Sequence, residues 1–157
     1  MDVEEQVLAR IYREMPLNSI WEGAGNVMCL DVLRALRKAP DVIAALAAEL
    51  DAANGRSRAY DAFCAPLKDR LQDASEHESC VRRRAEDSCS DASSARRLTQ
   101  DLALALQASL LARHAPDFVF DAFVASRLGA EWAGAFGTLA PNAPFDALLA
   151  RAMPVAA

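Results

Sequence analysis

The chain has 157 residues, of which 53% are hydrophobic and 25% are charged, and its formal net charge is −5 at pH 7. A chain of this length buries about two-thirds of the surface that it exposes when unfolded, so one folded unit is expected and the composition excludes intrinsic disorder. The acidic balance argues against a surface that binds polyanions everywhere, and a role on DNA would need a local basic cluster.

The first part of the chain predicts two helices joined by a short connection. Apolar residues at helical spacing predict a helix over residues 3–14, which stops at Pro16. Proline, asparagine, serine and glycine favour a tight connection over residues 15–25. Residues 26–38 form an amphipathic pattern. Its apolar side consists of Val27, Leu30, Leu33 and Leu36.

Two further helices are predicted between residues 40 and 74. Pro40 suits the first turn of a helix, and Asn54 followed by Gly55 supplies a left-handed ending. After Ser57 the periodic pattern resumes. Its apolar positions are Tyr60, Phe63, Leu67 and Leu71. Pro66 removes one backbone donor in the middle of this segment, so we expect a break near it.

The second half of the chain also predicts helices. Residues 75–94 have capping-box spacing but few apolar side chains, whereas residues 96–114 are rich in leucine and alanine on nearly every face, which predicts the central core helix. Residues 116–128 predict a helix that closes at Gly129, residues 132–142 a loop, and Pro144 the start of a short final helix that ends near Pro154. Because no run alternates apolar and polar residues, the predicted fold is an all-α helical bundle.

Cysteines, histidines and the first residues indicate the compartment and the metal content. No two cysteines have Cys-x-x-Cys spacing, so we expect reduced cytosolic thiols that pack in the core. The cysteines are Cys29, Cys64, Cys80 and Cys89. His77 and His114 have no second ligand at helical spacing, so no structural metal is predicted. Residues 1–5 are acidic and no stretch approaches ~20 uncharged apolar residues, so we expect a cytoplasmic chain with no membrane segment.

One short segment has a composition suited to chemistry. Residues 18–26 read Asn-Ser-Ile-Trp-Glu-Gly-Ala-Gly-Asn and place Glu22 between Trp21 and Gly23, directly before a helix. In a dry cleft the indole would raise the pKa of Glu22 toward the range in which a carboxylate acts as a general base. The glycines permit close backbone approach, and the free N–H groups of the helix favour an anion such as a phosphate. The alternative is that Glu22 complements the helix dipole and the glycines serve a turn.

Residues 12–34, Tyr-Arg-Glu-Met-Pro-Leu-Asn-Ser-Ile-Trp-Glu-Gly-Ala-Gly-Asn-Val-Met-Cys-Leu-Asp-Val-Leu-Arg, closely resemble the active-site segment of acyl-CoA dehydrogenases, in which an aromatic-Glu-Gly-Thr motif precedes a helix. They match still better the alkylation-response branch of that family, where Asn-Ser-Ile-Trp-Glu-Gly and Met-Cys-Leu-Asp-Val-Leu-Arg are typical. The resemblance implies that residues 1–38 are the end of the family's C-terminal helical domain. Residues 39–157 would then be a C-terminal helical extension, packed as one unit with it.

The resemblance also implies a reaction, a cofactor and a role for each site residue. The family dehydrogenates an acyl-CoA thioester: a carboxylate removes the α-proton and the β-hydride passes to FAD. Glu22 matches the base of the short- and medium-chain members, and in those relatives the backbone N–H of the same residue also binds the thioester carbonyl. Isovaleryl-type members carry their base at another position. The residues implied to lie near FAD are Trp21, Gly23, Ala24 and Asn26. Two positions depart from the family pattern, because Ala24 replaces a Thr or Ser and Met28 replaces a common glutamine. We therefore expect weaker cofactor contact.

The family fold also needs an N-terminal helical domain and a β-domain to hold the flavin and the acyl chain. We therefore expect this chain to be a fragment that neither retains FAD nor catalyses alone. Family members form homotetramers through C-terminal helices, so we expect self-association. The alternative function is a non-catalytic helical module for oligomerisation or DNA binding.

DNA binding is the second function that the resemblance implies, since alkylation-response relatives are associated with duplex DNA through the C-terminal helical region. Arg34 matches a basic position implicated there, although the same arginine has a structural role in ordinary dehydrogenases. The other basic clusters are Arg82, Arg83 and Arg84, and Arg96 and Arg97. Residues 55–113 contain ten Lys or Arg and nine Asp or Glu, a net charge of +1, so a solvated helix face is the competing interpretation.

Overall fold

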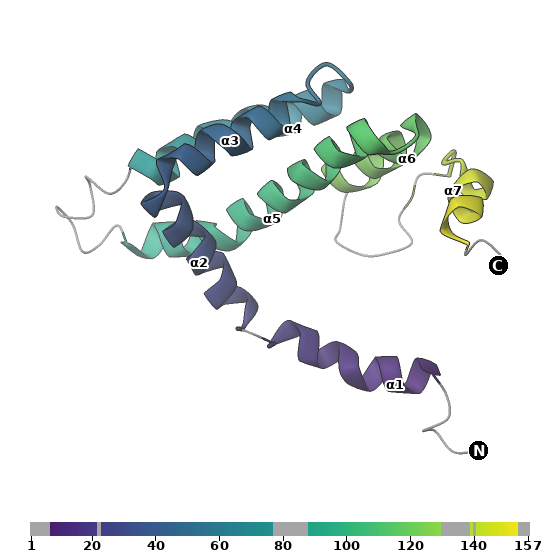
Figure 1. Cartoon of the computed structure of the whole chain (residues 1–157), viewed down its shortest axis with the longest axis horizontal. Coiled ribbons are helices and arrows are strands. Elements are labelled where there is room, and N and C mark those ends of the chain that lie inside the picture. The colour runs from purple at the N-terminus through teal and green to yellow at the C-terminus, as the bar shows by residue number, and fades with distance from the viewer. Residues whose placement is uncertain (1–6, 22, 77–87, 130–138, 140, 154–157) are drawn as a thin grey trace.

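The computed structural model describes residues 7–21, 23–76, 88–129, 139 and 141–153, and every regular element in this part of the chain is helical. The α-helices are α1 (Val7–Glu14), α2 (Gly25–Lys38), α3 (Pro40–Asp51), α4 (Arg58–Glu76), α5 (Ser88–His114), α6 (Asp117–Phe123) and α7 (Phe145–Ala152). A 3-10 helix, η2 (Met15–Ser19), follows α1, and a π-helix, η4 (Val124–Leu128), follows α6. The predicted all-α helical bundle is confirmed (Figure 1).

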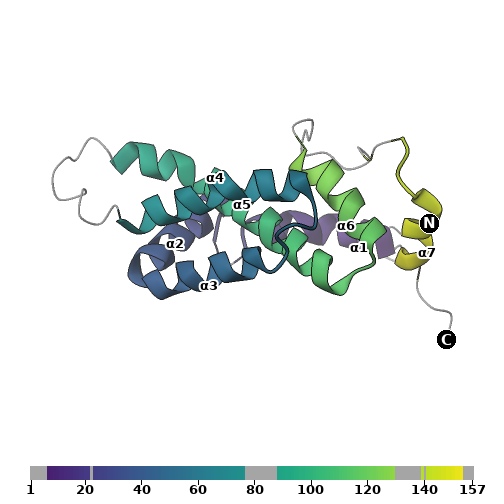
Figure 2. The same ribbon diagram turned by 90° about the horizontal axis from the view of Figure 1, so that it is seen from above.

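The helix α5 forms the centre of the bundle, as its leucine and alanine on nearly every face predict. It contacts α2, α3, α4, α6 and η4 (Figure 2). Ala105 and Ala108 are completely buried, and such small side chains let neighbouring helices approach closely. The helix begins at Ser88, earlier than the expected start at Arg96.

The largest buried side chains join α4 to α3 and α6. The rings of Tyr60 and Phe120 meet edge to face, with 6.3 Å between their centroids and 61° between their planes. Leu50, Leu67 and Leu71 are fully buried in the same core. This core anchors α6 to the first turn of α4.

Several predicted helix boundaries are confirmed. Pro40 lies in the first turn of α3, and Gly55 has a φ of 81°, the left-handed conformation expected after this helix. Pro144 immediately precedes α7. Parts of three other predicted elements lie outside the described residues. They are the start of the first helix (residues 3–6), part of the helix with few apolar residues (residues 77–87) and most of the loop (residues 132–138).

The break predicted at Pro66 is wrong, because α4 runs through this residue. Proline removes the hydrogen bond to the carbonyl of Ala62, but Pro66 and Ala62 are both exposed, so water can bind that carbonyl. On the opposite side of the helix, buried Leu67 and Leu71 hold α4 in the core. Packing therefore outweighs the loss of one exposed hydrogen bond.

The helix types of two short segments, η2 and η4, also differ from the predictions. Residues 15–19 form a 3-10 helix where a tight irregular connection was expected, and Pro16 fits its first turn because no donor is needed there. Residues 124–128 widen into a π-helix that the apolar pattern does not reveal. Gly129 ends this segment with an ordinary φ of −69°, and a Cβ at this position would lie 2.9 Å from the carbonyl oxygen of Ala125. Close approach, and not a left-handed turn, requires this glycine.

None of the described helices combines the length and the hydropathy that a membrane span requires.

Candidate functional site

The predicted active-site segment lies in the junction between η2 and α2. The backbone N–H of Trp21 donates to the carbonyl oxygen of Leu17 at 2.8 Å, and that of Gly23 donates to the carbonyl oxygen of Ile20 at 3.2 Å. These two hydrogen bonds close a turn that leaves the Trp21 side chain 63% exposed. The aromatic residue of the motif is thus presented at the surface of the described chain.

Gly23 lies in the turn that precedes α2. Its φ is 137°, a backbone conformation that residues with a side chain rarely adopt. Space is not the limit, because a Cβ there would lie 3.8 Å from side-chain atoms of Val27 and Met28, an ordinary contact. Backbone conformation alone therefore requires glycine at this position.

The start of α2 lacks a side-chain cap. Ala24 occupies the N-cap position in an extended conformation, with φ −62° and ψ 148°, and makes no side-chain hydrogen bond to the helix. The N–H groups of Gly25, Asn26 and Val27 have no carbonyl partner one turn earlier within the helix. The departure from Thr or Ser at Ala24 thus leaves these donors uncapped by that side chain.

Asn26 is held by a basic residue of the core helix. Nε of Arg96 donates to Oδ1 of Asn26 at 3.0 Å, and a second guanidinium nitrogen of Arg96 contacts the same oxygen. Gly25 lies against this contact, since a Cβ there would be 3.8 Å from the guanidinium. A residue predicted to approach a cofactor and one predicted to approach DNA therefore bind each other.

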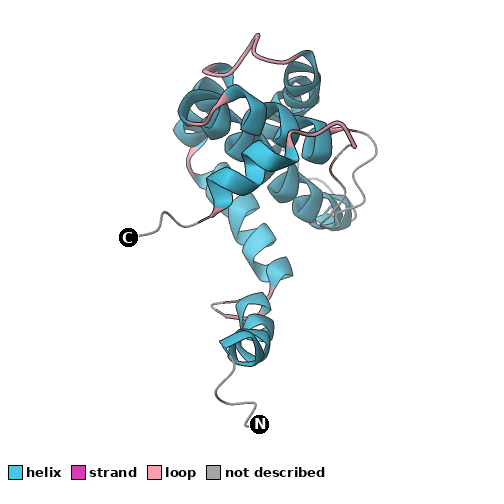
Figure 3. Cartoon of the chain, turned by 90° about the vertical axis from the view of Figure 1, so that its right-hand side faces the viewer, coloured by secondary structure: helices cyan, strands magenta, loops and turns pink. Residues whose placement is uncertain are grey.

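A series of large apolar side chains is exposed around this segment. We call it the apolar arm. It consists of Leu8, Ile11, Tyr12, Met15, Leu17, Ile20, Trp21, Val27, Met28 and Leu30. The predicted apolar side of α2 is buried at Leu33 and Leu36, whereas Val27 and Leu30 on the same side are 51% and 41% exposed. Figure 3 shows why: α1 and the start of α2 extend away from the bundle.

Some predicted site residues are not among the described residues. Glu22, the predicted base, lies outside the described residues, and so do Arg82, Arg83 and Arg84. Their roles stay predictions.

The remaining arginines of the predicted DNA site have acidic or polar neighbours. Arg34 forms an ion pair with Asp31 on the exposed face of α2. Nε of Arg97 lies 3.9 Å from Oδ2 of Asp101, which also accepts a 2.9 Å hydrogen bond from Arg70. DNA binding by these residues stays a prediction.

Two of the predicted core thiols are visible. Cys64 is buried and Cys29 is half-buried, and both are free. Burial raises the pKa of the Cys64 thiol above its ordinary value. In the described part of the chain, no three His, Cys, Asp or Glu residues form a group that could hold a metal ion.

No known family profile matches the chain, and no solved structure matches it significantly. The chain is 47% identical over 73 residues to AidB, an acyl-CoA dehydrogenase-like protein of Escherichia coli strain K12. The aligned segment covers 46% of this chain and 14% of that relative, so the chain spans only a small part of the relative's length. The similarity confirms the resemblance predicted from the motif: over part of its length, this chain is similar to an acyl-CoA dehydrogenase-like protein.

Proposed function

We propose that residues 21–26 form one wall of the active site in an acyl-CoA dehydrogenase-like flavoprotein. The observation that carries the proposal is the geometry on either side of Glu22. Trp21 is 63% exposed before it, and Gly23 turns the chain after it with a φ of 137°. The uncapped start of α2 follows at once, and Arg96 fixes it to α5.

In this proposal Glu22 is the general base that takes the proton from the α carbon of an acyl-CoA thioester. Trp21 supplies an apolar wall that excludes water from the carboxylate, as a base of this kind requires. The N–H groups at the start of α2 are directed out of the helix end, where a carbonyl or phosphate oxygen can accept from them. The carboxylate, the apolar wall and the donors would then lie within one short stretch of chain.

FAD is the cofactor that the resemblance implies, and the described residues fit it in part. The exposed indole of Trp21 offers a flat apolar surface, and the backbone at Gly23 carries no side chain that would keep a ring away. The hydroxyl that the family places at the N-cap is absent, because Ala24 occupies that position. The chemistry that a bound flavin supplies is acceptance of the β-hydride. We propose that other protein surface provides most of its contacts.

The apolar arm supports the proposal that this segment works against another protein surface. Exposed apolar patches of this extent are typical of surfaces that are covered in an assembly. In our proposal the rest of the flavoprotein covers the arm, excludes water from Glu22 and completes the pocket for acyl-CoA. A homotetramer of that assembly is part of the same proposal.

A chimaera tests this function. The matching segment of AidB is replaced by that of this chain, and flavin absorbance and turnover of a panel of acyl-CoA thioesters are measured. We expect the chimaera to retain flavin, and Glu22→Gln to lower turnover by about 10²-fold or more, the usual contribution of a general base. Glu14→Gln, an exposed glutamate in α1, is the matched control. Loss of flavin from the chimaera, or unchanged turnover in Glu22→Gln, contradicts the proposal.

A non-catalytic role in DNA binding or oligomerisation is the second proposal, and the apolar arm favours self-association in particular. If the arm pairs copies of this chain, sedimentation shows an oligomer that Leu8→Glu and Ile20→Glu together dissociate. A role on DNA, and with it a link to the alkylation response, predicts retardation of duplex DNA that decreases steeply with salt. Absence of retardation at low salt removes that second role.

A further inference from the structure

A groove opens at the carboxyl end of α5, where this helix meets α6 and α7. Its volume is about 400 Å³, within the ~300–1,000 Å³ range of small-molecule pockets. Leu110, Leu111, Ala115 and Phe123 supply its apolar wall. Leu110 is 47% exposed, so this wall is accessible to a ligand.

The described lining of this groove includes one cation, Arg151, and no carboxylate. Arg151 lines it from α7 and His114 from the last turn of α5, and none of its described lining residues is an Asp or a Glu. Within the described part of the chain, Arg151 and His114 form no ion pair. Arg113 is different, because its guanidinium is paired with Glu49 on α3. The uncompensated charge of Arg151 makes the groove favour an anion.

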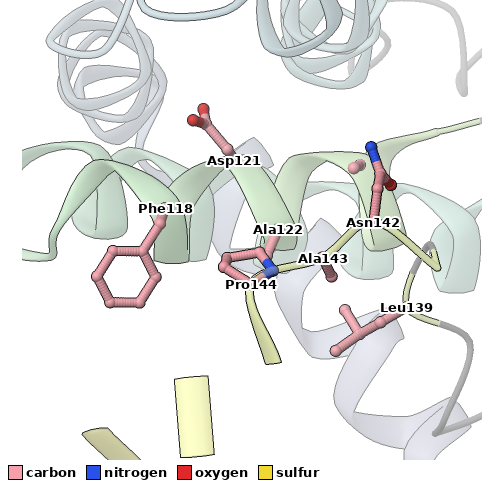
Figure 4. Close-up of a pocket in the computed structure, with 8 residues that line it drawn as sticks. Phe118, Asp121, Ala122, Leu139, Asn142, Ala143 and Pro144 are labelled. Carbon is pink, nitrogen blue, oxygen red and sulfur yellow. The ribbon is translucent and has the colours of Figure 1, made fainter. Parts of the chain in front are cut away.

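A second cavity near α7 has the opposite character. It has a volume of about 230 Å³ and lies between α6 and the segment before α7, with Phe118, Leu139 and Pro144 around it (Figure 4). Its described lining includes Asp121 and no cation, so it does not favour an anion. Both cavities lie next to α7 or the segment before it, and α7 buries none of its side chains completely.

We propose that the groove binds an amphipathic organic anion, a carboxylate on an aliphatic chain. The aliphatic chain lies on Leu110, Leu111 and Phe123, and the carboxylate accepts hydrogen bonds from Arg151, whose planar guanidinium can donate two in parallel. Because Arg151 belongs to α7, the bound anion holds α7 against the end of α5. This site is separate from the proposed active-site segment, which contacts α5 at Arg96.

Calorimetric titration of the full chain tests the site with three probes: octanoate, 1-octanol and acetate. We expect octanoate to bind, 1-octanol to bind more weakly because it lacks the charge, and acetate not to bind because it lacks the chain. Arg151→Gln should weaken octanoate binding about tenfold or more, because glutamine lacks the charge and can replace only one of the two hydrogen bonds, and leave 1-octanol unchanged. Arg151→Lys should restore part of the affinity.

Two further variants test whether octanoate binds in this groove. Leu110→Glu, at an exposed position, should abolish octanoate binding, whereas Arg113→Gln, in the same turn but paired away from the groove, should have no effect. Equal affinity for octanoate and 1-octanol, or unchanged affinity in Arg151→Gln, overturns the proposal. The proposal is also overturned if octanoate gives no heat and the chain forms a dimer that Leu110→Glu dissociates. That result would show that a second copy of the chain covers the groove.

Discussion

Arg96 on α5 donates from Nε to Oδ1 of Asn26 in the first turn of α2, with 3.0 Å between the two atoms. This hydrogen bond joins the segment after Glu22 to the helix at the centre of the bundle. Because α1 and η2 extend away from the bundle, the contact ties the motif's end of α2 to the core (Figure 3). The orientation of residues 23–26 therefore depends on it.

Removing this contact should loosen the start of α2. We expect Asn26→Ala to lower the free energy of unfolding by about 0.5–1 kcal/mol, the usual value for one exposed hydrogen bond, and to speed amide exchange in the first turns of α2. A double-mutant cycle with Arg96→Ala should reveal coupling between the two side chains. The same cycle with Arg97→Ala is the control, and equal coupling in both cycles would refute the link.

Adding a hydroxyl at the N-cap should strengthen α2. Ala24 already has the extended backbone of an N-cap, so Ala24→Ser can accept from the uncapped N–H groups and should raise the free energy of unfolding by about 1 kcal/mol in urea denaturation. Ala35→Ser, at an exposed position inside α2, is the control and should lower stability slightly, since serine is a weaker helix former. Equal effects at both positions would mean that the cap does not form.

The phenol of Tyr60 should stabilise the junction of α3 and α4. Its hydroxyl donates to the carbonyl oxygen of Leu50 at 2.9 Å, and that oxygen also accepts from the N–H of Ala53 at 3.3 Å. Tyr60→Phe should therefore lower the free energy of unfolding, measured by thermal unfolding, by only about 1 kcal/mol, because the carbonyl keeps one partner. Tyr12→Phe, at a side chain that is 79% exposed, should change nothing.

The pH dependence of this contribution has a definite sign. Burial raises the pKa of Tyr60 above its ordinary value. A raised pKa means that the contribution is complete below about pH 10, the ordinary pKa of tyrosine, and is lost as pH rises further. If the free energy of unfolding of Tyr60→Phe fell above pH 10 as steeply as that of the unchanged protein, this assignment would be contradicted.

The ion pair between Lys68 and Asp51 should contribute to stability above the acid range. The hydrogen bond from the Lys68 ammonium holds the pKa of Asp51 below its ordinary value. Its contribution is thus present at neutral pH and is lost as pH falls below about 4. In Lys68→Met, NMR titration should show the pKa of Asp51 rising toward the ordinary value. The control Lys38→Met, on α2, should leave the pKa of Asp51 unchanged. An unchanged pKa of Asp51 in Lys68→Met would mean that the ion pair does not form in solution.

Most helices were predictable because each one has a local signal. The prolines at positions 40 and 144 and the left-handed Gly55 lie at or near helix ends for reasons that need no distant partner. The long run of leucine and alanine before His114 predicted the central helix, since a helix that is apolar on nearly every face must be surrounded.

The differences arise where packing overrides a local preference. Pro66 is tolerated because Ala62, whose carbonyl it deprives of a partner, is exposed, and a sequence does not reveal which side of the helix is left exposed. The π-helix after Phe123 and the link between Arg96 and Asn26 depend on contacts with distant helices. Periodicity placed Val27 and Leu30 on one face, but it does not reveal whether anything covers that face. The candidate site was therefore recognisable by its motif but not by its surroundings.

The position of α5 along the chain has a consequence for synthesis. The helices α2, α3 and α4 all pack on α5, yet all three are translated before residues 88–114. Until then their apolar faces lack the surface that buries them, and nascent chains in this condition are typical clients of chaperones. The bundle therefore closes late in translation, once His114 has passed the exit tunnel.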